Sequence, residues 1–241
     1  GTIVGSSSST SLNVNWTAAA SGSVLVEEVN SAGCIGSSTF PVSMLPPVVA
    51  NAGPDMSVCA DQPVVQLNGN ILGATGGIWL NGTGSFNPEN MTLNARYTPS
   101  SLEITSGFVM LILETTGNQG CPPGRDTVII TISPIPNIAI SGTVVLCANS
   151  ITNYAVPLLT GNTYFWSVNG GAINGGNNGS TANVTWGSAS SGSITLTQTN
   201  NFGCDASQTM NVTMMAVPNP VFSGGSMPCQ YSTELYSVPV T

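Results

Sequence analysis

The sequence repeats itself at two fixed distances, and this repetition constrains the fold more than any other feature. A shift of 170 residues brings identical residues into register without a gap, including Trp16 with Trp186, Gly33 with Gly203 and Cys34 with Cys204. A shift of 82 residues does the same for Gly142 with Gly224, Cys147 with Cys229 and Tyr154 with Tyr236. Such periods are typical of tandem arrays of small domains.

The two shifts predict four segments: the back part of a module (1–47), a complete module (48–135), a second complete module (136–218) and the front part of a further one (219–241). Prolines mark each joint, as in Pro46–Pro47, Pro134–Ile–Pro136 and Pro218–Asn–Pro220. Because proline restricts its own backbone and that of its predecessor, we expect stiff connections and an extended array. Half a module cannot bury its apolar face, so we expect the natural polypeptide to continue in both directions.

Apolar and polar residues alternate in several short runs rich in β-branched side chains, which predicts half-buried strands. The clearest runs are Phe108–Glu114, Thr127–Ser133, Asn183–Trp186, Ser193–Thr199 and Met210–Met214. Glycine and asparagine clusters separate the runs, and no helical period of useful length is visible. The sequence therefore predicts an all-β chain of tandem immunoglobulin-like sandwiches.

The charge pattern excludes several functions. The 241 residues carry ten acidic side chains against two basic ones and no histidine, giving a net charge of −8. Nucleic-acid backbones and anionic lipids require clustered lysine or arginine, so binding to either is not expected. Without histidine or lysine, no serine has a base to activate it, and we expect no enzyme activity. No apolar run is long enough to cross a membrane.

Six cysteines suggest an oxidising compartment. Cys59 and Cys121 bracket the middle module, and Cys147 and Cys204 bracket the next. The simplest pairing is one disulfide per module, Cys59–Cys121 and Cys147–Cys204, with the partners of Cys34 and Cys229 outside the chain. Metal-bound or redox-active cysteines are the alternative, but neither a CxxC motif nor clustered spacing supports it.

Four tryptophans are expected in sandwich cores: Trp16, Trp79, Trp166 and Trp186. An exposed platform for stacking sugars is the alternative interpretation. Trp16 and Trp186 occupy the same repeat position, which favours a packing role common to every copy.

Carboxylates give little sign of a catalytic or metal site. Glu27 and Glu28 are adjacent, so in a strand they point to opposite faces and cannot work as an acid–base pair. Asp55 and Asp61 are close in sequence but lack the DxDxDG pattern of a calcium loop. Calcium there is a minor alternative to solvated loop acids, and no other cofactor is expected.

The middle segment contains Asn51-Ala-Gly-Pro-Asp, Gly73-Ala-Thr-Gly-Gly-Ile-Trp and Ala95-Arg-Tyr-Thr-Pro-Ser, and it resembles a repeat of very large Bacteroidetes surface adhesins. The flanking segments contain Tyr164-Phe-Trp-Ser-Val-Asn-Gly-Gly, Val184-Thr-Trp-Gly and Thr199-Asn-Asn-Phe-Gly-Cys, and they resemble the PKD-like repeats of the same proteins. Gliding-motility adhesins of the SprB type are examples. The resemblance implies type IX secretion, a position on the bacterial cell surface associated with the outer membrane, and movement by a motor.

Asp126-Thr127-Val128 resembles the O-glycosylation motif of Bacteroidetes, with Thr127 as the acceptor; an ordinary strand threonine is the alternative.

These observations predict a non-catalytic stalk segment of a bacterial surface adhesin filament, used in attachment and gliding. Its partners would be neighbouring repeats and a surface polysaccharide or other adhesion substrate. Two alternatives are a carbohydrate-binding accessory array of a secreted polysaccharide-degrading enzyme, and a self-assembling surface layer.

Overall fold

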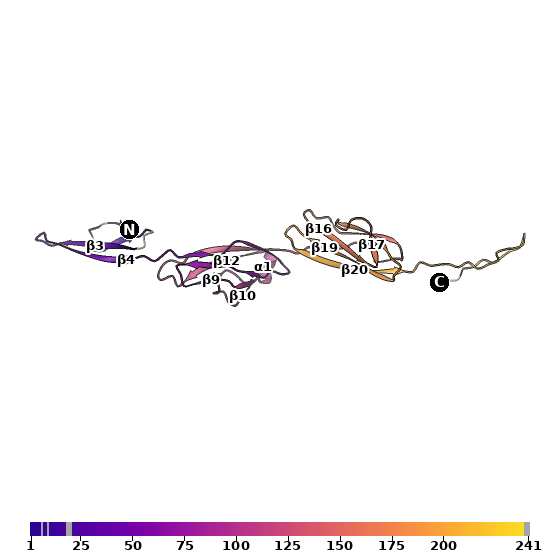
Figure 1. Cartoon of the computed structure of the whole chain (residues 1–241), viewed down its shortest axis with the longest axis horizontal. Coiled ribbons are helices and arrows are strands. Elements are labelled where there is room, and N and C mark those ends of the chain that lie inside the picture. The colour runs from indigo at the N-terminus through magenta and orange to yellow at the C-terminus, as the bar shows by residue number, and fades with distance from the viewer. Residues whose placement is uncertain (6, 9, 18–20, 239–241) are drawn as a thin grey trace. The chain divides into compact units, whose positions relative to one another are not determined.

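The structure is a computed structural model that describes residues 1–5, 7–8, 10–17 and 21–238 (Figure 1). Within these ranges the regular elements are strands, apart from one short helix, and the predicted all-β class is confirmed. The chain divides into two compact units. The first comprises Gly1–Val58 and Gln62–Ile132, and the second comprises Cys59–Asp61 and Ser133–Thr241.

The beginning of the first unit consists of two antiparallel pairs. β1 (Thr2–Val4) pairs with β2 (Asn13–Asn15), and β3 (Ser21–Val29) pairs along its length with β4 (Ile35–Ser43). Large apolar side chains of this hairpin, such as Val26 and Phe40, are exposed. This part of the chain therefore lacks the buried core that the next segments have.

The rest of the first unit, with Cys59 and Ser133 at its margins, forms a sandwich. One sheet has the order β6-β13-β12-β9, the facing sheet has the order β10-β11-β7, and β5 pairs with β8. The strands are β5 (Val49–Asn51), β6 (Met56–Cys59), β7 (Val65–Gln66), β8 (Asn70–Leu72), β9 (Gly76–Leu80), β10 (Ser85–Asn87), β11 (Arg96–Thr98), β12 (Phe108–Thr116) and β13 (Arg125–Ser133).

The second unit is a sandwich of the same kind. Its sheets have the orders β14-β20-β19-β16 and β15-β18-β17, and β14 runs parallel to β20. The strands are β14 (Val145–Cys147), β15 (Ile151–Ala155), β16 (Thr163–Asn169), β17 (Gly171–Ile173), β18 (Thr181–Trp186), β19 (Ser191–Thr199) and β20 (Asp205–Met215).

Alternation along the strands fills both cores. In β12, Val109, Leu111 and Leu113 are buried while Phe108 and Met110 are exposed. The second core contains Tyr154, Trp166, Trp186, Ile194 and Leu196 among others. The alternating runs in the sequence therefore identify the inward faces of these strands correctly.

Three of the four tryptophans are core residues: Trp79, Trp166 and Trp186 are at most 1% exposed. The expectation for Trp16 was wrong, because this side chain is only partly buried. Its ring still lies against Gly22, as the ring of Trp186 lies against the matching Gly192. Trp16 thus contacts the glycine that its repeat position predicts. Among the described residues, however, Trp16 remains partly exposed, whereas Trp186 is enclosed in the core of the second sandwich.

One helix was missed by the sequence reasoning. α1 (Ser101–Ser106) begins with a capping box between Ser100 and Glu103 and ends at Gly107, whose φ is 81°. Six residues are too few to show a helical period, so only the Ser-x-x-Glu pattern and the following glycine could have indicated it.

Candidate functional site

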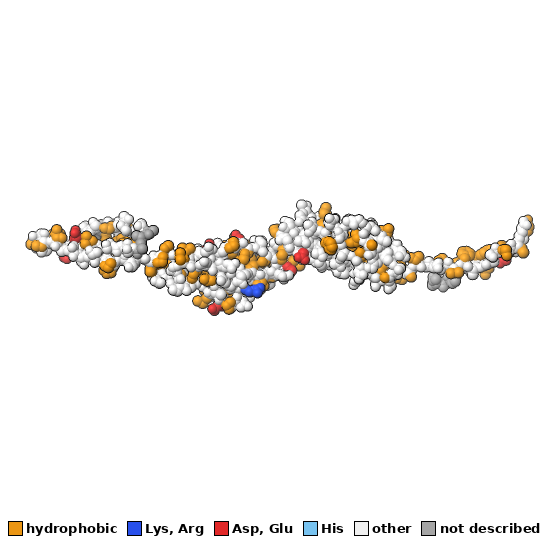
Figure 2. Space-filling model, in the orientation of Figure 1, with side chains coloured by type: hydrophobic (Ala, Val, Ile, Leu, Met, Phe, Trp, Pro, Cys, Tyr) orange, Lys and Arg blue, Asp and Glu red, His pale blue; other side chains and the backbone are white. Residues whose placement is uncertain are grey.

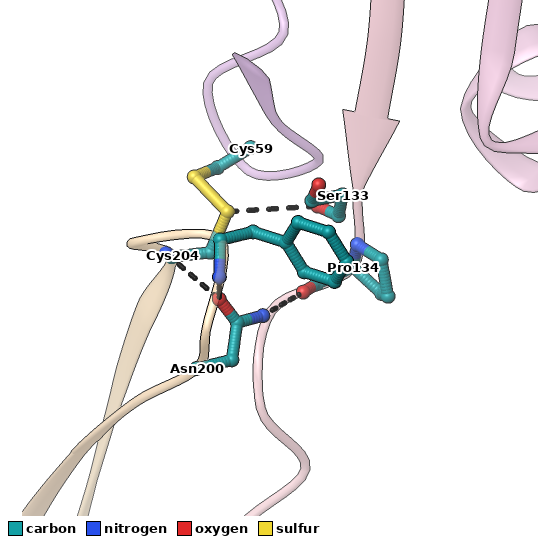
Figure 3. The surroundings of a disulfide bond; sticks show 6 residues. Cys59, Ser133, Pro134, Asn200 and Cys204 are labelled. Carbon is teal, nitrogen blue, oxygen red and sulfur yellow. Dashed lines mark hydrogen bonds between the residues drawn. A yellow bond between two sulfur atoms is a disulfide. The ribbon is translucent and has the colours of Figure 1, made fainter. Parts of the chain in front are cut away.

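The sulfur bridge Cys59–Cys204 is the most distinctive chemical feature of the described residues (Figure 3). Cys59 is the last residue of β6, and Cys204 lies in the turn between β19 and β20; their Cα atoms are 5.6 Å apart. Both cysteines belong to the second unit, because Cys59–Asp61 is grouped with it. The disulfide therefore joins the end of β6 to the β19–β20 turn, across a sequence separation of 145 residues.

The predicted pairing of Cys59 with Cys121 was wrong. The amide of Ala60 donates a 2.9 Å hydrogen bond to the carbonyl of Ser133, so Cys59 lies beside the last residue of β13. Cys121 lies in the loop before the first residue of β13. Nine residues at about 3.3 Å each place the strand ends roughly 26 Å apart, whereas a disulfide needs Cα atoms within about 7 Å.

The predicted pairing of Cys147 with Cys204 fails for the same reason. Cys147 pairs with Met215, the last residue of β20, whereas Cys204 directly precedes Asp205, its first residue. The eleven residues of β20 separate the two cysteines by roughly 33 Å. In each sandwich, one cysteine lies where the last strand begins and the other where it ends.

The turn that holds Cys204 is tightly organised. The side-chain oxygen of Asn200 accepts hydrogen bonds from the amides of Phe202 and Cys204, each 3.0 Å long. Its side-chain nitrogen donates a 2.8 Å bond to the carbonyl of Pro134, and the Cys204 sulfur contacts the carbonyl of Ser133 (Figure 3). Asn200 thus fixes the turn against the segment through which the chain enters the second sandwich.

The other four cysteines, Cys34, Cys121, Cys147 and Cys229, have free thiols. Cys121 is partly buried and the other three are exposed. Among the described residues, no group of three or more cysteine, aspartate and glutamate side chains is arranged to hold a metal ion.

A buried tyrosine–carboxylate pair stabilises the first sandwich. The Tyr97 hydroxyl donates to both Glu103 oxygens at 2.8 Å and accepts a hydrogen bond from the Gly84 amide. Burial, together with the Glu103 hydrogen bond, raises the pKa of Tyr97. Burial alone would raise the pKa of Glu103, but the amides of Thr83 and Ser100 and the Tyr97 hydroxyl outweigh it and lower that pKa. This pair anchors α1 and the β10–β11 sheet.

The remaining acidic candidates are dispersed. Asp55 precedes β6 and Asp61 follows it, so the length of the strand separates them and they do not form one calcium site. Asp55 accepts a hydrogen bond from the amide of Ile129. Glu27 and Glu28 are consecutive exposed residues of β3, whose side chains point to opposite faces.

Thr127 lies on β13 opposite Ile112 and is exposed. The neighbouring Asp126 is not free, because its carboxylate accepts a 2.8 Å hydrogen bond from the amide of Ala52. Thr127 remains a predicted glycosylation acceptor with an accessible side chain.

The surface is nearly free of charged side chains. Figure 2 shows a face of backbone and uncharged polar atoms, with scattered apolar side chains and few acidic or basic ones. Arg125 forms an ion pair with Glu114 across the β12–β13 hairpin. In the described part of the chain, no helix has the length and apolar character needed to cross a bilayer.

Comparison with known proteins supports the assignment of one segment. Residues 133–212 match the family model described as a PKD-like domain, which is less than half of the chain. This segment largely overlaps the predicted module 136–218. A search of the curated proteins finds no match.

Several solved structures of multidomain β proteins are similar at low identity. Extracellular cadherin domains 3–6 of protocadherin gamma B2 are 8% identical with a TM-score of 0.36, covering 74% of this chain and 49% of that one. Extracellular domains 3–5 of Drosophila OTK are 12% identical with a TM-score of 0.39, covering 82% and 72%. A Ca²⁺-stabilised ice-binding adhesin of an Antarctic bacterium is 12% identical with a TM-score of 0.41, covering 82% and 57%.

The chain thus spans about half the length of the first of these structures.

Proposed function

We propose that this chain is a non-catalytic stalk segment of a large bacterial surface adhesin, in which tandem sandwiches hold a distant binding element away from the cell. The proposed modules are 48–135 and 136–218, with parts of further modules at 1–47 and 219–241. The observation that carries the proposal is the disulfide between the end of β6 and the β19–β20 turn, because it covalently links a strand of the proposed module 48–135 to a turn of the proposed module 136–218.

The chemistry of the described residues agrees with a spacer. The buried tyrosines and tryptophans pack the cores, and the one buried carboxylate, Glu103, is fully engaged in hydrogen bonds that fix a helix. Structural disulfides are typical of proteins outside the cytoplasm, which agrees with a place on the cell surface. By the resemblance of its motifs, the chain would belong to an adhesin of the gliding-motility type, exported by type IX secretion.

The carbohydrate-binding alternative requires aromatic platforms on the surface. Trp79, Trp166 and Trp186 are buried and cannot stack on a sugar without unfolding their sandwiches. The accessory array would therefore have to stack sugars on exposed phenylalanines such as Phe165 and Phe202, and the loss of the tryptophans as platforms favours the stalk.

Small-angle X-ray scattering of the chain tests the stalk. We expect a maximum dimension close to that of sandwiches joined end to end. In dithiothreitol, which opens the Cys59–Cys204 bond across the same joint, replacing Pro134 and Pro136 with glycine should shorten the mean dimension by loosening the joint. A compact particle, unchanged by the proline substitutions, would contradict the proposal. Retention on immobilised polysaccharides with micromolar affinity would instead favour the accessory array.

A further inference from the structure

We propose that each of the four free cysteines forms a disulfide of the same kind as Cys59–Cys204, with a partner cysteine in a neighbouring module. In this scheme the cysteine at the end of the strand that lies beside a module's last strand binds the turn cysteine of the module that follows it. Cys147 and Cys229 would bind the next module, and Cys34 and Cys121 the preceding one. The array would then be a chain of sandwiches with a disulfide at every joint.

Cys59 and Cys147 each end a strand, and we call them, with Cys229 at the position that repeats Cys147, the strand-end cysteines. The amide after Cys59 donates to the carbonyl of Ser133, the last residue of β13, and the amide after Cys147 donates to that of Met215, the last residue of β20. Both cysteines therefore lie at the distal end of their sandwich, where the chain leaves it.

Cys229 repeats the local structure of Cys147. The hydroxyl of Ser150 donates a 2.7 Å bond to the carbonyl of Cys147, and the hydroxyl of Ser232 donates a 2.9 Å bond to the carbonyl of Cys229. Tyr154 and Tyr236 also contact the matching glycines, Gly142 and Gly224, in the same way. The repeat at 82 residues is thus structural as well as sequential.

Cys34, Cys121 and Cys204 form the second class, the turn cysteines. Each follows a glycine with positive φ, namely Gly33 at 81°, Gly120 at 91° and Gly203 at 82°. In the turn of Cys34, the Asn30 side chain accepts bonds from the amides of Ala32 and Cys34 at 2.9 and 3.0 Å. The same two bonds link the Asn200 side chain to the amides of Phe202 and Cys204. The turn therefore holds Cys34 in the same local conformation as Cys204.

The loop of Cys121 lies where the turn of Cys204 lies, at the proximal end, where the chain enters the sandwich. Gly124, in the same loop as Cys121, lies against the start of this module: a Cβ atom placed on Gly124 would be 2.9 Å from the carbonyl oxygen of Val48. Cys204 is likewise beside Ser133 and Pro134. Cys121 therefore occupies the position of the bonded turn cysteine, although its loop has one residue fewer between asparagine and cysteine.

The positions of the two classes dictate the partners. Strand-end and turn cysteines of one sandwich lie at opposite ends of its last strand, too far apart to bond. A strand-end cysteine at the distal end can meet only a turn cysteine at the proximal end of the following module. Cys59 and Cys204 are the one such pair for which this chain contains both members.

The chemistry of closure is thiol–disulfide exchange. One thiolate attacks a disulfide oxidant, such as an oxidised thiol–disulfide oxidoreductase or glutathione disulfide, and forms a mixed disulfide with loss of one thiol. The second cysteine then displaces the remaining half. Two protein thiols are oxidised, the oxidant is reduced to two thiols, and both protons remain on them.

This inference goes beyond the stalk role and does not depend on it, since a surface layer or an accessory array built from the same modules would close the same bonds. Connectivity by mass spectrometry tests the linkage, whereas the scattering experiment tests the stalk, so the two can fail separately.

The test is a tandem chain of residues 1–241, 160–170 and 1–241 in that order. By the two repeat distances, residues 219–241, 160–170 and 1–47 then form one uninterrupted module between the copies. The chain is oxidised with glutathione disulfide, digested with pepsin without reduction, and its linked peptides are sequenced by mass spectrometry.

We expect Cys59–Cys204 in both copies and two new bonds, from Cys147 and Cys229 of the first copy to Cys34 and Cys121 of the second copy, respectively. Pairing within modules would instead give Cys229–Cys34 and Cys147–Cys204, and this result would overturn the proposal. The linked peptides differ in sequence, so the two schemes cannot be confused.

A second chain avoids the composite module. It joins residues 1–218 to residues 137–241, so that the module with the PKD-like match occurs twice, with Cys147→Ser in the second copy. We expect peptides containing Cys204 to be linked to Cys59 and to Cys147 in equal amounts, with no free thiol among them. Alkylation of half of the Cys204 thiols by iodoacetamide would overturn the proposal.

Discussion

Replacing Cys204 with serine should strongly destabilise the second unit. The substitution is nearly isosteric, and it leaves the hydrogen bonds of the turn to the Asn200 side chain intact, since these come from backbone amides. The main change is therefore the loss of the covalent link to Cys59. A disulfide of this kind stabilises a protein chiefly by restricting the unfolded chain.

The size of the effect follows from the loop that the bond closes. If both units unfold, the loop spans 145 residues, and the entropy relation gives about 5 kcal/mol. If only the sandwich formed by β14–β20 unfolds, β6 and β13 still hold Cys59 beside Ser133. The loop then spans the 71 residues between Ser133 and Cys204, which gives about 4.4 kcal/mol. The two values are close, so the prediction does not depend on whether the units unfold together.

Equilibrium urea unfolding followed by tryptophan fluorescence measures the loss, because Trp166 and Trp186 report on the second core. We expect the free energy of unfolding to fall by about 4–5 kcal/mol and the midpoint of thermal unfolding to fall by about 20–30 °C. Cys121→Ser is the matched control, because it removes a thiol that has no partner in this chain. The control should change the stability by less than about 1 kcal/mol.

Reduction supplies an independent check. The wild-type chain in dithiothreitol should unfold like Cys204→Ser without reductant, and the variant should not respond to the reductant. A loss below about 1.5 kcal/mol, well short of the loop-closure value, would refute the reasoning. An equal response of variant and wild type to dithiothreitol would refute it as well.

Three further predictions concern the cores and the mechanics. Glu103→Gln should lower the free energy of unfolding of the first unit at pH 7 by about 1–3 kcal/mol. The pKa of Glu103 in the folded protein is below its ordinary value of 4.5. In acid titrations, the difference in unfolding free energy between wild type and variant should therefore shrink as the pH falls below 4.5 and vanish below the folded pKa. Trp166→Ala should cost about 3–5 kcal/mol in urea unfolding, whereas the adjacent exposed residue in Phe165→Ala should cost less than about 1 kcal/mol. In single-molecule pulling from the two ends, reduction should release the chain between Cys59 and Cys204, whose sequence separation is 145, lengthening the extended chain by about 500 Å.

The sequence predicts the strands well because their cores are built by alternation. In β12, Leu111 and Leu113 are buried, whereas Met110, the neighbour of Leu111, is exposed, as a period of two requires. Trp16 was mispredicted because the repeat pattern reports a packing position but not how many layers surround it. α1 was missed because a single turn and a half has no period to detect, and its capping box depends on a glutamate that a hydrophobic pattern ignores.

The disulfide pairing could not be predicted from spacing, and the reason lies in the topology. Cys59 and Cys121 bracket one module in sequence, but the strand that ends in a cysteine runs parallel to the last strand. β14 pairs in parallel with β20, and β6 lies beside β13 with Asp55 hydrogen-bonded to Ile129 at one end and Ala60 hydrogen-bonded to Ser133 at the other. The end of the strand that carries the cysteine therefore meets the end of the last strand, whereas the preceding turn lies at the start of that last strand. Two cysteines that bracket a module in the sequence therefore lie a whole strand length apart in the structure.

Pairing of β6 with β13 and of β14 with β20 also gives the two cysteine classes a consistent direction. In both sandwiches the strand-end cysteine lies where the last strand ends, and the turn cysteine lies where that strand begins. In the proposed array a short linker connects the exit of one module with the entrance of the next, so the two classes of cysteine can meet at that linker. Each bond then encloses one joint, and bonds at successive joints enclose overlapping lengths of chain. In the proposed array, the residues enclosed by such a bond could not extend under tension until the sulfur–sulfur bond broke, whereas hydrogen bonds between strands can open one after another.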